Sequence, residues 1–205
     1  MTSSRIGTAV LLVCGLLVGG LAAVAALPQV RERLFPDGRV RVVGQALVGG
    51  PFKLTDHTGK TVTDRDFRGK HMLVFFGFTF CPDVCPTALQ VVAAALEKLG
   101  PKADRIVPLF ITIDPERDTP QQMAQYVQSF SPRLIGLTGT QAEIDTVLKE
   151  YRVYARKVPD PKSSAGYTMD HSAIIYVIGP DGAYQAHFTH TTDAAVMAER
   201  LAKML

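Results

Sequence analysis

The sequence has no tryptophan, only three cysteines among 205 residues, and no large excess of either charge. A net charge of +3 without a basic stripe argues against a nucleic-acid partner. With 47% hydrophobic and 20% charged residues, the composition is that of a folded protein and not of a disordered chain. Internal repeats, a phosphate-binding loop, a Ser/His/Asp constellation and a paired-carboxylate site are also missing, so the common signatures of solenoids, nucleotide-binding enzymes and hydrolases are not found.

An uncharged and largely apolar run covers residues 6–27. A helix of this length spans roughly 30 Å of hydrocarbon, whereas the apolar region of a signal peptide covers only about 7–15 residues. We therefore expect residues 1–27 to be a membrane anchor, made of a cytoplasmic tip and one transmembrane helix. Cleavage near Ala23-Val24-Ala25 is the alternative. Residues 28–46 are then expected to be a linker with an irregular strand, and residues 47–205 one domain.

The domain alternates predicted strands and helices. The stretch Met72–Phe76 is continuously apolar, which predicts a central strand buried on both faces. A helix follows the cysteines and ends at Gly100-Pro101. Further strands are predicted over 52–54, 61–63, 106–113, 134–137, 173–178 and 183–188, and further helices from 118, over 141–154 and from 192 or 193. This order predicts an α/β fold of the thioredoxin-like type, a mixed sheet flanked by helices.

Two segments of the domain are open to interpretation. Residues 155–170 are polar, contain Pro159 and Pro161 and lack periodicity, so we expect a long loop of the kind that is often functional. The acidic segment Asp114–Asp118 reads as a helix start capped by Asp118, with Arg117 paired to a neighbouring carboxylate. The alternative is a role in partner docking or in support of a metal site.

Cys81 and Cys85 lie where the central strand turns into the following helix. If the helix begins by Pro82, both thiols lie near its first turn and on nearly the same face. Unpaired backbone N–H groups at that position favour the thiolate form. Such a pair can bind a soft metal such as Cu(I) or Zn(II), form a reversible disulfide, or do both.

Two thiolates alone under-fill a copper or zinc site, and imidazole is the natural third ligand. The chain has five histidines. His71 lies roughly 30 Å from the cysteines along the strand, His57 lies in a predicted surface turn, and His187 and His190 end the last predicted hairpin. His171 lies between the long loop and an apolar strand, and its spacing leaves a metal ligand and an ordinary loop histidine equally open.

Three separated motifs resemble the SCO/SenC family. They are Cys-Pro-Asp-Val-Cys-Pro at 81–86, Asp-Pro-Glu-Arg-Asp-Thr-Pro at 114–120 and Asp-His-Ser at 170–172, and the resemblance covers roughly residue 47 to the C-terminus. Proteins of this family are membrane-anchored and thioredoxin-like, and help to assemble the binuclear copper centre of cytochrome c oxidase. The resemblance implies a copper site of Cys81, Cys85 and His171, and a metal-free form that can close the Cys81–Cys85 disulfide.

From this resemblance we expect a copper chaperone in a bacterial inner membrane, with its soluble domain in the periplasm. It would take copper, as Cu(I), Cu(II) or both, from a copper donor protein and deliver it to cytochrome c oxidase subunit II. The alternative is a thiol-disulfide oxidoreductase, in which Cys81 and Cys85 reduce the copper-ligand cysteines of that subunit or other periplasmic disulfides. The Cys-x3-Cys spacing, one residue longer than in thioredoxins, favours metal binding over rapid dithiol exchange.

Overall fold

The computed structural model describes residues 48–163 and 165–205. The predicted membrane anchor (1–27) and linker (28–46) lie outside the described residues. Within the part of the chain that is described, none of the helices combines the length and the hydropathy that a membrane span requires.

The described residues alternate strands with helices in the predicted order. The strands are β1 (Lys53–Asp56), β2 (Thr61–Thr63), β3 (His71–Gly77), β4 (Ile106–Thr112), β5 (Ile135–Thr138), β6 (Ala155–Pro159), β7 (Tyr167–His171), β8 (Ile174–Ile178) and β9 (Tyr184–Thr189). The helices are α3 (Val84–Leu99), α4 (Pro120–Gln128), α5 (Gln141–Tyr151) and α6 (Ala194–Ala202), with short 3-10 helices at Asp64–Phe67 and Gly100–Arg105.

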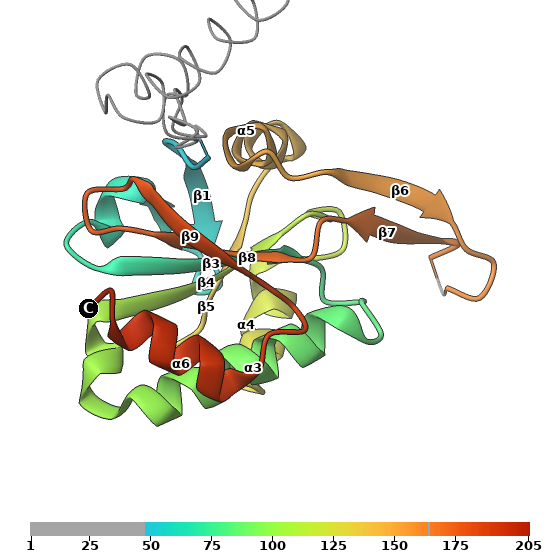
Figure 1. Ribbon diagram of the computed structural model, residues 1–205. Coiled ribbons are helices and arrows are strands. Elements are labelled where there is room, and N and C mark those ends of the chain that lie inside the picture. Colours follow the sequence, from blue (N-terminus) through green and yellow to red (C-terminus); the bar gives the residue numbers. More distant parts are fainter. Residues whose placement is uncertain (1–47, 164) are drawn as a thin grey trace, which may run out of the picture. The chain divides into compact units, whose positions relative to one another are not determined.

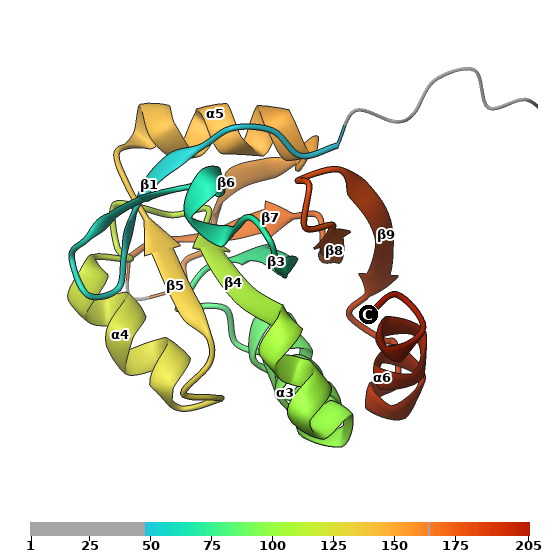
Figure 2. The same ribbon diagram turned by 90° about the vertical axis from the view of Figure 1, so that its left-hand side faces the viewer.

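Seven strands form one mixed sheet in the order β2-β1-β5-β4-β3-β8-β9. Strands β3, β4 and β5 are parallel, and the outer strands pair antiparallel. Because β3-α3-β4 and β4-α4-β5 step across the sheet in the same direction, right-handed crossovers place α3 and α4 on the same face. Figures 1 and 2 show α3, α4 and α6 on one side of the sheet and α5 on the other. The prediction of a mixed sheet flanked by helices is confirmed.

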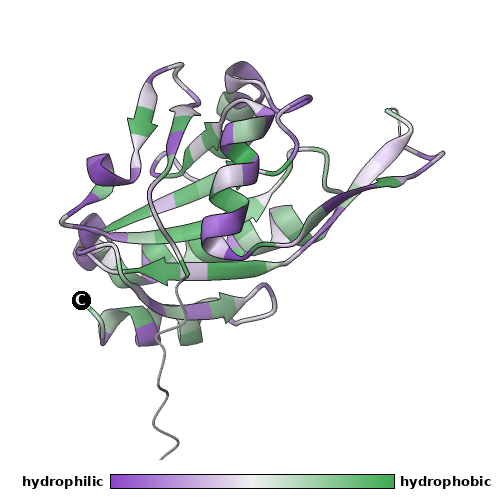
Figure 3. Ribbon diagram, turned by 90° about the horizontal axis from the view of Figure 1, so that it is seen from above, coloured by the Kyte–Doolittle hydropathy of each residue, from purple (hydrophilic) through white to green (hydrophobic). Residues whose placement is uncertain are grey.

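The core lies on both faces of the central strand. All seven residues of β3 are buried, as predicted from its continuous apolar run, and β4 beside it is almost as deeply buried. Hydrophobic residues accordingly dominate the central strands in Figure 3, whereas the outer segments carry more hydrophilic ones. The carboxyl end of β3, where the chain reaches the cysteines, is therefore surrounded by the most deeply buried part of the domain.

The start of α4 differs from the prediction. Thr119 is the N-cap residue, and its hydroxyl accepts a hydrogen bond from the Gln122 N–H at 3.2 Å. Pro120 occupies the first turn, as predicted. The prediction that Asp118 caps this helix is wrong, because its carboxylate is buried and turns instead toward the segment that carries the cysteines.

Residues 155–170 are not a long loop, and that prediction is wrong. They form an antiparallel hairpin of β6 and β7, with pairs running from Ala155 and His171 to Pro159 and Tyr167. The two strands make a separate sheet, and Figure 1 shows them extending away from the central sheet. Most of their residues are exposed or half-buried, so neither face produces the alternation of apolar and polar residues that marks a strand in a sequence.

Candidate metal centre

The first thiol precedes helix α3 and the second lies in its first turn. The helix begins at Val84 after the N-cap residue Asp83, so the predicted start by Pro82 is slightly too early. Cys85 is fully buried, whereas Cys81 is partly exposed. The backbone N–H of Cys85 donates to Cys81 Sγ at 3.4 Å. An otherwise unpaired donor of the first helical turn therefore points at Cys81, as the helix-terminus argument requires.

A buried carboxylate fixes the segment between β3 and the thiols. Asp118 accepts hydrogen bonds from the backbone N–H of Thr79 at 3.0 Å and from its hydroxyl at 2.6 Å. The hydroxyl of Thr112, at the end of β4, donates to the same carboxylate at 2.6 Å. Asp118 therefore ties the segment that leads to Cys81 to the neighbouring strand. Burial raises its pKa, and these three donors oppose that shift.

Gly77 makes room for the buried thiol. A Cβ atom at this position would lie 2.7 Å from Cys85 Sγ and 2.8 Å from the Phe110 ring. Both contacts are shorter than a side chain tolerates, so only glycine at the end of β3 lets the Cys85 sulfur sit against the strand.

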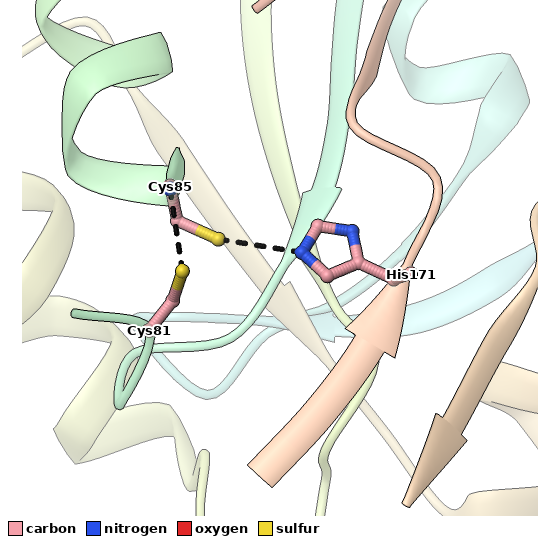
Figure 4. Close-up of side chains that lie close together, drawn as sticks. All are labelled: Cys81, Cys85 and His171. Carbon is pink, nitrogen blue, oxygen red and sulfur yellow. Dashed lines mark hydrogen bonds between the residues drawn. The ribbon is translucent and has the colours of Figure 1, made fainter. Parts of the chain in front are cut away.

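His171 is the last residue of β7, and its ring points at the thiols (Figure 4). Its Nδ1 lies 3.1 Å from the carbonyl oxygen of Ser172, which fits a tautomer in which Nδ1–H donates and Nε2 keeps its lone pair. Nε2 in turn lies 3.6 Å from Cys85 Sγ. The rings of Phe75 and Phe78 meet the imidazole edge-on, at centroid distances of 6.3 Å and 6.1 Å. The free nitrogen is thereby directed toward the two sulfurs.

The structure brings together the three residues predicted to form the site. The ligand atoms of Cys81, Cys85 and His171 all lie within 4.8 Å of one another, a spacing that could hold a metal ion. Both cysteines are free thiols. Two sulfurs and one imidazole nitrogen form a soft donor set, which suits Cu(I) and Zn(II) and is poorly suited to Mg²⁺ or Ca²⁺.

The two thiols differ in acidity. The hydrogen bond from the Cys85 thiol lowers the pKa of Cys81 to about 4, and the hydrogen bond from the Cys85 N–H acts in the same direction. The pKa of Cys85 is raised, first by its hydrogen bond to Cys81 and then by burial. The metal-free pair therefore holds one thiolate and one thiol, with the negative charge on the more exposed sulfur.

The other four histidines lie elsewhere. His57 Nδ1 accepts from the Gly136 N–H at 3.1 Å, His71 is buried at the start of β3, and His187 Nδ1 lies 2.6 Å from the Tyr184 hydroxyl. His190 follows β9 and is half-buried. Among the described residues, His171 is the histidine grouped with the two thiols.

The model of the SCO1/SenC family matches residues 41–205. The chain belongs to the SCO1/SenC family. It is 44% identical over 176 residues to the human mitochondrial SCO1 homolog, an alignment that covers 83% of this chain and 58% of the relative. The chain thus spans less than two thirds of that relative's length.

Solved structures of the SCO1/SenC family have the same fold. The copper-bound structure of Bradyrhizobium japonicum ScoI is 47% identical, covers 77% of this chain and 99% of its own, and superposes with a TM-score of 0.72. Copper-bound yeast Sco1 is 35% identical, with a TM-score of 0.70 and coverage of 76% and 87%. These similarities confirm the predicted thioredoxin-like fold.

Several residues that support the centre were missed in the sequence. For Asp118, the contacts fit the alternative interpretation of the acidic segment, support of a metal site, and not the helix cap. Thr79 and Thr112 were given no role, and the contact between Thr79 and Asp118 joins segments 39 residues apart. Tyr167 lay in the presumed loop, yet its hydroxyl donates to the buried Asp114 at 3.0 Å. The run Tyr-Thr-Met at 167–169, rich in residues that favour strands, was the signal that could have revealed β7.

Proposed function

We propose that this chain binds one copper ion through Cys81, Cys85 and His171 and hands it on as a metallochaperone. The observation that carries the proposal is the convergence of two sulfurs and one imidazole nitrogen within 4.8 Å. The donor set fits Cu(I), for which thiolates are the preferred ligands. The copper-bound relatives, at 47% and 35% identity, support the same assignment.

The two thiols would hold the metal and His171 would complete the coordination. The Cys81 thiolate is already available for the first bond, whereas Cys85 must lose its proton when copper binds. Nδ1 of His171 is engaged by the Ser172 carbonyl, which leaves Nε2 to face the metal. In this proposal copper is the cargo, so the site must release the ion as well as bind it.

We further propose that the recipient is subunit II of cytochrome c oxidase, where the ion would enter the binuclear copper centre, and that a donor protein supplies the copper. In this proposal residues 1–27 anchor the chain in a bacterial inner membrane and the described domain lies in the periplasm. Membership of the SCO1/SenC family supports the recipient, and the uncharged run at 6–27 supports the anchor.

The test is an anaerobic copper titration of the reduced protein. Wild type is expected to bind about one copper per chain, and Cys81→Ser, Cys85→Ser and His171→Ala are each expected to bind far more weakly. Loss of a direct ligand should exceed the 10–100-fold that loss of an outer-shell partner typically costs. An unchanged copper affinity of His171→Ala would refute the three-ligand site. Delivery is measured separately, with the copper-binding domain of subunit II as the acceptor of copper from the loaded protein.

A second function, thiol-disulfide exchange, is favoured by the difference in acidity between the two thiols. The Cys81 thiolate would attack a substrate disulfide, which forms a mixed disulfide and releases one substrate thiolate. Cys85 would then lose its proton and attack Cys81, closing the Cys81–Cys85 disulfide and releasing the second substrate thiol. The substrate gains two electrons from the pair and one proton from Cys85, and water supplies the second proton. A thiol reductant would have to restore the pair.

This second function is tested without copper. Reduced protein is mixed with a peptide that carries the oxidised copper-ligand cysteines of subunit II, and two free peptide thiols are expected for each Cys81–Cys85 disulfide formed. Cys85→Ser should accumulate the mixed disulfide at Cys81. If no peptide thiol appears, the chain is not a reductase of this substrate.

A further inference from the structure

A cluster of rings and charges joins the β6–β7 hairpin to the body of the domain beside the metal centre. The guanidinium carbon of Arg117 lies 4.1 Å from the centre of the Tyr167 ring, 4.8 Å from that of Phe80 and 5.6 Å from that of Phe78. Tyr167 belongs to the hairpin, whereas the two phenylalanines belong to the segment that leads to Cys81. One cation therefore contacts both parts of the molecule that supply ligands.

Asp114 is the buried carboxylate that contacts both Arg117 and Tyr167 in this cluster. Its side chain is fully buried and forms an ion pair with Arg117 Nε. It also accepts a hydrogen bond from the Tyr167 hydroxyl at 3.0 Å. Because a buried carboxylate requires partners, Asp114 favours the position in which Arg117 and Tyr167 both reach it. Arg117 Nη1 adds a long contact of 3.5 Å to the carbonyl oxygen of Tyr167.

The hairpin depends on such attachments. Strands β6 and β7 pair with each other and not with the central sheet, and a two-stranded hairpin is marginally stable on its own in water. Tyr167 and His171 are the first and last residues of β7. Residues four apart in a strand lie on the same face, about 13 Å from each other. An attachment at Tyr167 therefore controls the orientation of the strand face that presents His171.

We propose that Tyr167 is a positioning residue of the metal centre. Its ring stacks on Arg117 and its hydroxyl donates to Asp114, and together these contacts fasten β7 so that the His171 imidazole faces the thiols. The inference rests on the proposed copper binding, because it assigns Tyr167 an effect on metal affinity through His171. Tyr167 does not touch the metal ligands and acts on them only through the strand.

The experiment is a double-mutant cycle on copper affinity. Tyr167→Ala is expected to weaken binding about tenfold, in the range of a lost outer-shell partner. In the His171→Ala background the same substitution should change affinity less than about twofold, since the imidazole that it positions is gone. Tyr167→Phe keeps the ring over Arg117 and loses only the hydrogen bond to Asp114, so it should weaken binding measurably but less than Tyr167→Ala does. Tyr154→Ala, which removes an exposed tyrosine just before β6, is the matched control and should bind as wild type does.

A second readout uses metal-free, reduced protein. The imidazole of His171 and the Phe78 ring have centroids 6.1 Å apart, so proton NMR should show nuclear Overhauser contacts between them in wild type and in Tyr154→Ala. These contacts should weaken in Tyr167→Ala. This measurement also separates the two proposals: if wild type binds no copper, the proposed function fails, and the ring contacts alone decide the role of Tyr167.

Two results would overturn the inference. One is an equal loss of copper affinity on Tyr167→Ala with and without His171, which would mean a general effect on the fold. The other is wild-type affinity in Tyr167→Ala together with unchanged ring contacts. If Tyr167→Ala does not fold, Tyr167→Phe decides through the same cycle. Loss of the hydroxyl alone should then weaken binding measurably when His171 is present and not when it is absent.

Discussion

The candidate metal centre takes its three side chains from two regions that are held in different ways. Cys81 and Cys85 flank the N-terminus of α3, close behind the fully buried strand β3, and the neighbouring Phe78 is only 2% exposed. His171 ends a hairpin that lies outside the central sheet and contacts the body of the domain through Tyr167, Met169 and Ala155. The two thiols thus lie beside the core of the domain, whereas the imidazole lies on the β6–β7 hairpin outside the central sheet.

This difference suggests how one site can both hold and release an ion. Moving the thiol segment would expose core residues, which costs a large part of the stability of the domain. Detaching the hairpin would expose little apolar surface, because most of its residues are already exposed or half-buried. We therefore expect the bond to His171 to be the first to open on release, with copper still held by both sulfurs.

The largest expected effect tests the rigidity of the thiol region. Asp118→Ala leaves the N–H and hydroxyl of Thr79 and the hydroxyl of Thr112 without their acceptor. A buried unsatisfied donor costs about 1–3 kcal/mol, so the free energy of unfolding should fall by about 3 kcal/mol or more. Urea unfolding measures this loss. Asp118→Asn, which keeps one acceptor oxygen, should lose less stability. A loss under about 1 kcal/mol for Asp118→Ala would mean that the Asp118 carboxylate does not stabilise the thiol segment.

The same contrast separates what could be predicted from the sequence from what could not. The thiol region follows from local patterns, because β3 is a continuous apolar run and α3 shows helical periodicity up to Gly100. The hairpin lacks a buried face, and so the sequence pattern of its two strands predicts a polar loop. The prediction that Asp118 caps a helix failed for a different reason. Its partner Thr79 lies 39 residues earlier, and a local capping rule does not detect such a contact.

The candidate site was predicted by resemblance more than by physical pattern. The spacing of Cys81 and Cys85 indicated a thiol pair at a helix start, and this follows from chemistry alone. The proximity of His171 depends on the return of β7 to the thiols across 86 residues of sequence, and its spacing left a metal ligand and a loop histidine equally open. Long-range packing decides such a contact, and only the family motifs carried information about it.

The two thiols beside the core should differ in their reactivity toward an alkylating reagent. In reduced, metal-free protein at pH 6, iodoacetamide should modify Cys81 more than about 100-fold faster than Cys85, because only Cys81 is both partly exposed and ionised. The lowered pKa of about 4 for Cys81 fixes the sign of the pH dependence. The rate should stay level down to about pH 5 and fall as the pH passes through 4. The stabilisation that the folded state gains from this thiolate is instead lost progressively as the pH falls from 9.0, the ordinary pKa of the thiol, to about 4.

Fragment mass spectrometry, which locates the label on Cys81 or on Cys85, measures both rates, and Cys85→Ala serves as the control for crossover between the sites. In that variant Cys81 loses the hydrogen bond that Cys85 supplies, so the midpoint of its pH profile should move upward. Equal labelling of the two cysteines would contradict the difference in acidity on which the reductase proposal rests.

A smaller effect is expected at Gly77, where the core meets the thiols. Gly77→Ala introduces a Cβ atom 2.7 Å from Cys85 Sγ and 2.8 Å from the Phe110 ring. Overpacking of this kind costs about 1–3 kcal/mol, which we expect to see in urea unfolding as a loss of about 2 kcal/mol. The displaced sulfur should also weaken copper binding. Gly59→Ala is a control for the glycine change alone, since its added Cβ meets nothing within 4 Å, although its backbone φ of +88° adds some strain of its own.

The smallest effect is expected on the hairpin itself. Lys157 pairs with Glu116 at 2.6 Å and lies 4.7 Å from the centre of the Tyr167 ring, on the side of the molecule where the hairpin meets the 114–117 segment. Both charged side chains are largely solvent-accessible, so the pair should contribute less than about 1 kcal/mol. Lys157→Ala should therefore leave the free energy of unfolding and the copper affinity near their wild-type values at physiological salt. A tenfold loss of copper affinity would instead show that the hairpin is fastened by this exposed ion pair, and would shift the attachment away from the buried contacts of Tyr167.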